Sequence, residues 1–199
     1  MADALGNDVT LVGVPLTGFL AYAPEGTAIP SPSDGGKPKL TLDAAFRKAG
    51  LLTEDGGFEW TEEPDGDALE FWQSGYSIPS GKATVELVFT AAEESPVTRA
   101  LRTGKTPDTN GYLTVDGGGN ATRYVFITEE AYANGAIRRR VAVGRVKSAK
   151  LAKSERGTVQ GIEFTIEVVR HPLFNNDHYG EWVIAPSSAE PGGPEASGG

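Results

Sequence analysis

Residues 75–84 contain the glycines and the lysine that a phosphate-binding loop uses. Such a loop needs Ser or Thr directly after the lysine to reach the metal, and a helix whose first N–H groups point at the phosphates. Ala83 follows Lys82 instead, the glycine spacing is one residue off, and a strand-like alternation comes next. The segment is therefore predicted to be a β-turn with a lysine at its tip.

The only two histidines, His171 and His178, could ligate a metal together with Asp177. Two imidazoles and a carboxylate suit zinc or iron. The loop between the histidines matches no recognised ligand spacing, and the chain has no cysteine, which excludes disulfides and thiolate metal sites. We expect no metal and no cofactor.

Acidic doublets occur at residues 62–63, 93–94 and 129–130. A glycosidase needs two carboxylates at a set separation inside a cleft. A hydrolase with a covalent nucleophile needs Ser or Cys beside a histidine base. No such nucleophile set is evident in the sequence, so the doublets are interpreted as exposed charges and the protein is predicted not to be an enzyme.

Charge is unevenly distributed along the chain, whose formal net charge is −9. All charged residues within 54–70 are acidic, whereas those within 138–156 are basic except for Glu155. On a strand, Arg139 would face one side and its two arginine neighbours the other. That split favours ion pairs between subunits over a nucleic-acid groove, although the two regions could also be solvated faces that meet within one fold. The candidates for inter-subunit pairs are Arg138, Arg139, Arg140, Glu62 and Glu63.

The elements that must position these residues are mostly strands. Strict alternation of apolar and polar residues predicts strands at residues 83–90 and 159–169, each with one buried face. The remaining strands are expected at residues 9–23 (two strands, broken near Pro15 and Gly18), 58–61, 69–72, 122–128, 137–146 and 181–185.

Two short helices are expected. Thr41 can cap a helix that ends at Gly50, with its apolar residues on one face. Ser95 and Pro96 open a second helix, which Gly104 ends.

The chain is predicted to be one mainly β domain, residues 1–185, folded as a β-sandwich or barrel with one or two short helices. It has an N-terminal arm (1–8) and a long loop (24–40). Residues 186–199, rich in Pro, Gly and Ser, are expected to be a disordered tail. No apolar run approaches the roughly 18 residues that span a bilayer, and the first residues lack the pattern of a signal peptide. We therefore expect no membrane association and assembly in a host cytoplasm.

The order of motifs in residues 19–104 points to a known family. The sequence Ala-Pro-Glu-Gly-Thr-Ala-Ile-Pro at 23–30 ends a strand and opens the long loop. Residues 46–56, a Trp strand around Trp72, and residues 84–90 before the second helix follow in order. This succession resembles the major tail proteins of siphophages, particularly those that infect actinobacteria.

The resemblance implies a structural protein of the virion tail. Subunits of this family form hexameric rings whose strands join into a barrel around a lumen, and the rings stack along a tape measure protein. Tail terminator and tail tip proteins would be further partners, and DNA would pass without specific binding. Acidic residues suit a lumen that must not hold DNA, and the candidates are Glu86, Glu163 and Glu167. The candidates for contacts between rings are Ile29, Pro30, Ser31, Pro32, Ser33 and Asp34.

Two other functions remain open from the sequence. A capsid decoration or head-surface protein would share the composition and the lack of an active site. A carbohydrate-binding β-sandwich could use Trp60, Trp72 or Trp182 as a stacking platform.

Overall fold

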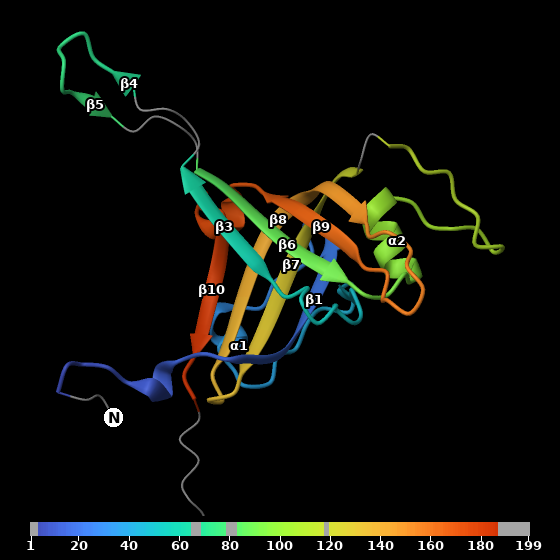
Figure 1. Ribbon diagram of the computed structural model, residues 1–199, viewed down its shortest axis with the longest axis horizontal. Helices are drawn as coiled ribbons and strands as arrows, with labels where there is room; N and C mark the ends of the chain where they lie inside the picture. The colour runs from blue at the N-terminus through green and yellow to red at the C-terminus, as the bar shows by residue number, and fades with distance from the viewer. Residues whose placement is uncertain (1–3, 65–68, 79–82, 118–119, 187–199) are drawn as a thin grey trace, which may run out of the picture.

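The computed structural model describes residues 4–64, 69–78, 83–117 and 120–186, and it is mainly β (Figure 1). The predicted fold class is confirmed. The strands are β1 (Pro15–Pro24), β2 (Arg47–Lys48), β3 (Glu59–Pro64), β4 (Leu69–Glu70), β5 (Ser77–Ile78), β6 (Ala83–Ala91), β7 (Asn120–Tyr132), β8 (Ile137–Leu151), β9 (Ile162–Val168) and β10 (Tyr179–Ile184). The helices are α1 (Pro32–Gly35) and α2 (Pro96–Thr103), with 3₁₀ turns η1 (Val9–Leu11) and η2 (Pro172–Phe174).

One curled antiparallel sheet forms the body of the protein, in the order β2-β1-β7-β8-β9-β6-β3. Strand β8 is the central strand of the sheet. Strand β7 pairs along one of its edges, while β10 pairs with the first half of the other edge and β9 with the second half. At Gly144, where the partner changes, an added Cβ would lie 2.7 Å from the carbonyl oxygen of Glu167. The sheet therefore takes the barrel-like alternative of the predicted architectures, and β4 and β5 form a separate hairpin away from it (Figure 1).

The concave side of the sheet holds the larger core. Leu20 of β1 and Phe89 of β6 share it although three strands separate them in the sheet order, so the curl must bring them together. Phe89 and Phe164 stack with ring centroids 5.1 Å apart, and Leu101 of α2 closes one end. The alternation predicted for β6 and β9 is what supplies these buried side chains.

The convex side is covered as well, over β1, β7 and β8. Ala21, Val125, Ile127, Val141 and Val143 lie beneath residues of the 24–46 segment, η2 and β10. Central strands buried on both faces read as continuous apolar runs, which is why residues 125–128 and 141–144 are all buried.

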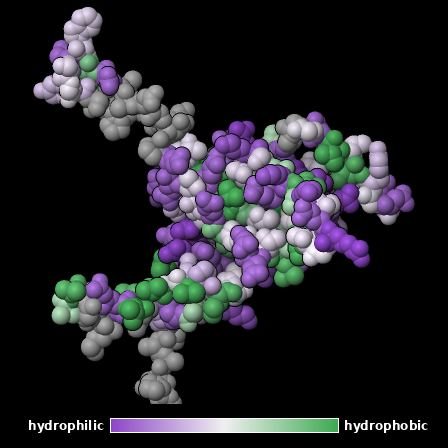
Figure 2. Space-filling view, viewed as in Figure 1, coloured by the Kyte–Doolittle hydropathy of each residue, from purple (hydrophilic) through white to green (hydrophobic). Residues whose placement is uncertain are grey.

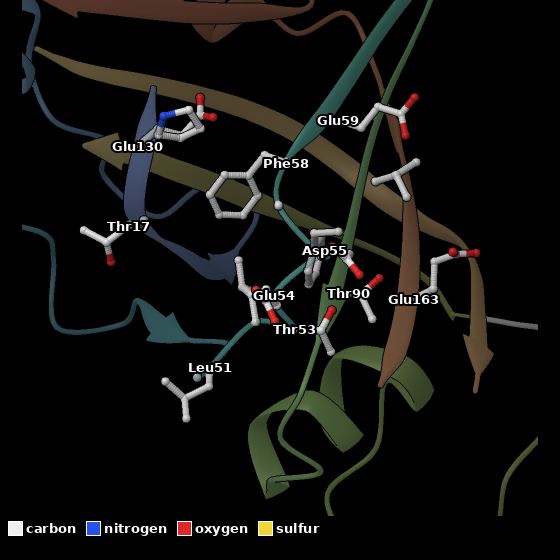
Figure 3. A pocket seen from close by; sticks show the side chains of 18 of the residues that line it. Thr17, Leu51, Thr53, Glu54, Asp55, Phe58, Glu59, Thr90, Glu130 and Glu163 are labelled. Carbon is white, nitrogen blue, oxygen red and sulfur yellow. The ribbon is translucent and has the colours of Figure 1, made fainter. Parts of the chain in front are cut away.

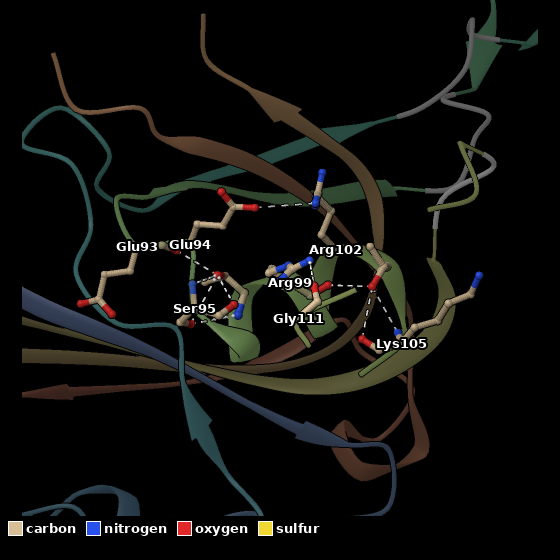
Figure 4. A network of polar contacts seen from close by, with 9 residues as sticks. Glu93, Glu94, Ser95, Arg99, Arg102, Lys105 and Gly111 are labelled. Atoms are coloured by element: carbon tan, nitrogen blue, oxygen red, sulfur yellow. Dashed lines mark hydrogen bonds and ion pairs between the residues drawn. The ribbon is translucent and has the colours of Figure 1, made fainter. Parts of the chain in front are cut away.

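Helix α2 forms as predicted and holds a long loop. Ser95 and Thr98 make a reciprocal capping box, and Gly104 takes the left-handed conformation at the C-cap with φ of 69°. The Arg99 guanidinium donates to the Gly111 carbonyl (3.0 Å), so the loop after the helix is tied back to it (Figure 4).

Tyr22 of β1 links the sheet to α2 by a hydrogen bond, in which its hydroxyl donates to the Val97 carbonyl at 2.7 Å. Burial raises the pKa of Tyr22 to about 12, against an ordinary value of about 10. The folded protein thus holds this proton more tightly than the unfolded chain. The resulting stabilisation is complete below pH 10 and is lost as the pH rises through about 12.

We expect the free energy of unfolding to fall between pH 10 and about 12, and to fall less in Tyr22→Phe. The variant should also lose about 1 kcal/mol at pH 8, the typical net value of one hydrogen bond. Urea unfolding at pH 8, 10 and 11.5 measures both effects. An identical alkaline loss in the two proteins would contradict the assignment to Tyr22.

The predicted helix at residues 41–49 is wrong. Residues 43–46 form a turn in which Ala45 N–H donates to the Asp43 carboxylate (2.8 Å). After it, β2 pairs with β1 and Ala49 N–H donates to the Leu20 carbonyl (2.9 Å). Pairing along the edge of β1 outweighs a weak local helix preference here. A helical turn instead forms at α1, inside the long loop.

Several strand boundaries also differ from prediction. Residues 9–11 form the 3₁₀ turn η1, and β1 is one strand from Pro15 to Pro24 with an irregularity near its start. Strand β4 ends before residues 71–72. The predicted tail from residue 187 and residues 1–3 of the arm lie outside the described residues. Among the described helices, none is long and apolar enough to cross a membrane.

Candidate functional site

One of the two histidines, His171, has structural contacts. His171 accepts from the Leu173 N–H (3.2 Å) through Nδ1, at the start of η2, and its Nε2 lies 3.3 Å from a Glu25 carboxylate oxygen. Across the described parts of the chain, no three His, Cys, Asp or Glu side chains are grouped to hold a metal ion. Ala83 begins strand β6, not a helix, and residues 79–82 of the glycine-containing segment lie outside the described part.

The buried Arg139 is the least expected polar residue in the fold. Its side chain has no exposed surface and bridges to Glu129 with Nε–Oε2 at 2.6 Å. The two terminal nitrogens donate to the carbonyls of Gly35 (2.7 Å), Lys37 and Pro38 (2.8 Å). All of these partners belong to the same chain, so Arg139 has no surface to offer a neighbouring subunit, and its prediction as an inter-subunit charge is wrong.

The split of the arginine triplet between two faces is confirmed. Arg138 and Arg140 lie on the opposite face from Arg139, and both reach Glu181 on β10, at 3.6 and 2.8 Å. Glu62 accepts the Tyr179 hydroxyl, a bond that raises the pKa of Tyr179 to about 12. These contacts join β8, β10 and β3 within one chain.

The 24–40 loop packs onto its own subunit. Pro30 and Gly35 are buried, and an added Cβ on Gly35 would collide with the Trp182 ring. The Trp182 indole donates to the Pro32 carbonyl (2.9 Å), and Arg139 binds three carbonyls of the loop. The outer side of the loop stays exposed, and its exposed residues include Ser31, Pro32, Ser33 and Asp34 at α1. Hydrogen bonds from Lys37 and Ser31 lower the pKa of Asp34.

The three acidic lumen candidates share one outward face of the sheet. Glu86 of β6 lies directly opposite Glu167 of β9, and Glu163 lies two alternations along β9 on the same side. Glu86 is bonded to Lys147, whose pKa this contact raises, and Glu167 to Arg145 at 2.7 Å. This outer face, formed by β3, β6, β9 and the C-terminal half of β8, therefore carries charges of both signs.

Two segments expose apolar side chains that the sequence pattern did not predict to be exposed. The first is the N-terminal segment, along which apolar side chains gather on the surface (Figure 2). Its exposed residues are Leu5, Val9, Leu11, Val12, Val14 and Leu16. The second is the β4–β5 hairpin, where Trp72 is 99% exposed and Phe71 and Tyr76 are more than half exposed. Contiguous exposed apolar surface of this kind marks interaction sites, whereas Trp60 and Trp182 pack in the core clusters.

A groove remains where the curled sheet fails to close on itself (Figure 3). It lies between the start of β1 and residues 50–59, and its volume is about 760 Å³. Leu16, Leu51 and Phe58 contribute apolar surface. Its carboxylates are Glu54, Asp55, Glu59, Glu130 and Glu163, and none of the described residues that line it is Lys or Arg.

The groove and the unpaired strand edges describe a subunit that is built to contact other chains. Strand β3 pairs only with β6, and residues 15–19 of β1 pair only with β7, among the residues that the structure describes. Such edges are templates for further pairing unless they are covered. No feature of the described residues assembles a catalytic set around the groove.

Comparison with known proteins agrees with a structural role. A search of curated proteins finds no match. Residues 4–173 match the family described as "Phage tail tube protein". That span covers most of the chain, so the protein belongs to the phage tail tube protein family and is a structural component of the virion tail.

Proposed function

We propose that the chain forms closed hexameric rings that stack into the tail tube and conduct DNA during ejection. The observation that carries this proposal is the unclosed sheet with its unpaired edges. Exposed apolar side chains on the N-terminal segment and on the β4–β5 hairpin support it. A ring covers edges that would otherwise aggregate, and head-to-tail contacts between rings build an open filament. The tape measure, terminator and tip proteins are the proposed partners within the tail.

Electron microscopy of the purified chain at high concentration tests this function. Hollow tubes of stacked six-fold rings are the expected result. Closed trimers would contradict it and favour a decoration protein of the capsid. Tail subunits can need an initiator to polymerise, so the same grids should include the chain mixed with tail tip complexes.

The outer face of β3, β6, β9 and β8 is the proposed lumen wall. Its acids are matched by bases on neighbouring strands, so phosphate groups meet few unpaired cations there. Phosphate binding grows with each cation that can displace counterions from DNA. The exposed outer side of α1 stays a proposed contact between rings, and Glu62, Glu63, Arg138 and Arg140 stay proposed contacts between subunits.

We expect Glu167→Lys to slow DNA ejection while tubes still assemble. The ring symmetry repeats each substitution around every ring, so one change adds a circle of cations beside Arg145, which lies opposite Glu167. Fluorescence of released DNA from variant particles measures the rate, with Glu155→Lys in the turn after β8 as the matched control. Loss of tube assembly in Glu167→Lys would contradict the placement of this face in the lumen.

A further inference from the structure

We propose that the basic turn of one subunit (residues 150–159, the end of β8 and the turn that follows it) binds in the groove between β1 and residues 50–59 of its neighbour in the same ring. This inference rests on the proposed ring and names a charged contact between its subunits. Three properties of the chain support it: the chemistry of the turn, the chemistry of the groove, and the place of both at one end of the sheet.

The basic turn presents cations beside apolar side chains. Its charged residues are Lys150, Lys153, Glu155 and Arg156. The single acid is bonded to Lys153 at 3.0 Å, and the Lys153 side chain is still 83% exposed. Leu151 is 42% exposed and Val159 is 65% exposed. The turn therefore offers a net positive charge together with apolar surface that its own subunit leaves uncovered.

Hydrogen bonds within the basic turn give it a defined shape. The Gln160 side-chain amide donates to the Ala152 carbonyl (2.9 Å) and to the Ser154 hydroxyl (2.8 Å). The Ala152 N–H donates to the Gly161 carbonyl (2.9 Å) at the base of the turn. A segment that is already ordered loses less conformational entropy when it binds, so this turn is suited to make a contact.

The groove has the complementary chemistry. Leu16, Leu51 and Phe58 offer apolar contact, and the five carboxylates around them accept hydrogen bonds (Figure 3). Lys and Arg side chains only donate hydrogen bonds. A cleft lined by one sign of charge concentrates its field and attracts the opposite sign. The groove therefore favours a basic segment with apolar neighbours, and it disfavours an acidic one.

The basic turn and the groove lie at one end of the sheet, on the two sides of a four-strand stretch (Figure 1). Strands β8, β9, β6 and β3 lie in this order, and Leu151, Ile162 and Ala91 are partners across the first three at this end. The turn joins β8 to β9 on one side, while residues 54–59 lead into β3 on the other. Among the described residues, 147–151 of β8 pair only with β9, and β3 pairs only with β6. Rotation about an axis along the strands can therefore set the turn of one copy beside the groove of the next at the same height, and such a contact between two different surfaces can close into a ring.

Reversal of the charge on either surface should prevent assembly without unfolding the subunit. The turn variant Lys153→Glu/Arg156→Glu sets acids against an acidic groove, and the groove variant Glu54→Lys/Asp55→Lys sets bases against a basic turn. All four positions are exposed, so both variants should keep the melting temperature of the parent. In each variant alone, we expect the critical concentration for tube growth to rise by at least about tenfold, which corresponds to 1.4 kcal/mol.

A control separates this contact from a general effect of net charge. Lys105→Glu/Arg170→Glu changes the net charge as much as the turn variant does, at exposed positions outside both surfaces. It should assemble at the concentration of the parent. A rise as large as that of the turn variant would contradict the inference.

A mixture of the two reversed variants distinguishes a contact between chains from one within a chain. When the variants alternate around an even-numbered ring, an acidic turn meets a basic groove and a basic turn meets an acidic groove at successive contacts. The equimolar mixture should therefore assemble near the concentration of the parent, although neither variant does so alone. A turn that bound its own groove would be rescued only in one chain that carries all four changes.

Crosslinking locates the contact, because the chain has no cysteine of its own. The variant Thr158→Cys/Gly57→Cys removes no charge, and an added Cβ at Gly57 meets nothing within 4 Å. A short bismaleimide added to assembled tubes should link chains up to the number in one ring, because a lateral contact closes on itself. Each single-cysteine variant is a control, since one thiol per chain links at most two chains. Linked series longer than one ring would show an axial contact and contradict the inference.

Two further results would overturn the inference. Normal tubes from both reversed variants, without links between positions 158 and 57, would leave the tube function standing and remove this contact. Rescue in the chain with all four changes, without rescue in the mixture, would place the contact within one subunit. Failure of the unmodified chain to form tubes, even with tail tip complexes, would instead refute the proposed function itself.

Discussion

Replacement of Arg139 by alanine is expected to lower the free energy of unfolding by about 3–5 kcal/mol, the usual result of removing one partner of a buried ion pair. The guanidinium has four acceptors, namely Glu129 and the carbonyls of Gly35, Lys37 and Pro38. Alanine leaves all four without this donor, and the bond to the Gly35 carbonyl lies in a fully buried place. An unsatisfied buried acceptor costs about 1–3 kcal/mol before any cavity is counted.

The loss should also release the 24–40 loop. Three of the four bonds fix carbonyls of that loop, so its backbone should become a protease site between residues 35 and 40 in Arg139→Ala. Urea unfolding at pH 7 and limited proteolysis measure the two effects. Arg138→Ala, on the partly exposed opposite face with a longer contact to Glu181 (3.6 Å), is the matched control and should lose under about 1 kcal/mol. Equal losses in the two variants would contradict a special role for Arg139.

Arg139→Lys separates the effect of charge from the effect of shape. Lysine keeps the positive charge beside Glu129 but has no planar fork to span several carbonyls. We expect a stability between those of the parent and the alanine variant. A lysine variant as stable as the parent would show that charge alone matters at this position.

Replacement of Phe164 by alanine should cost about 3–5 kcal/mol, which is typical of a large aromatic removed from a core. Phe164 is fully buried on the concave side of the sheet and stacks on Phe89 at 5.1 Å. It also belongs to the cluster that includes Leu20 of β1 and Leu101 of α2. The cavity would therefore lie where the curl of the sheet brings distant strands together.

The neighbouring residue on the same strand supplies the control. Glu163 points to the outer face and is exposed, so Glu163→Ala should change the free energy of unfolding by less than about 0.5 kcal/mol. Chemical unfolding of both variants under one set of conditions tests the alternation of β9. A large loss in Glu163→Ala, or a small one in Phe164→Ala, would contradict the assignment of faces.

Local sequence determined the parts of the fold whose signals are short and strong. Period-two alternation placed β6 and β9 with the right residues inside, because each residue on a strand faces opposite to the last. Ser95, Pro96 and Gly104 marked both ends of α2, because the cap and the left-handed turn need those residue types. The order of motifs in residues 19–104 indicated the tail tube family without any tertiary information.

Tertiary structure decided the features that depend on residues far apart in the chain. Arg139 looked like a surface charge beside its two neighbours, and its burial depends on Glu129 and a loop about a hundred residues earlier. The helix expected at residues 41–49 gave way to pairing with β1, which no local pattern signals. The groove exists only because the sheet curls without closing, and Trp72 is exposed because it lies in a hairpin that forms a sheet separate from the main one. Composition and periodicity report which residues prefer to be buried, whereas contacts between distant segments determine which of them are left for another subunit to cover.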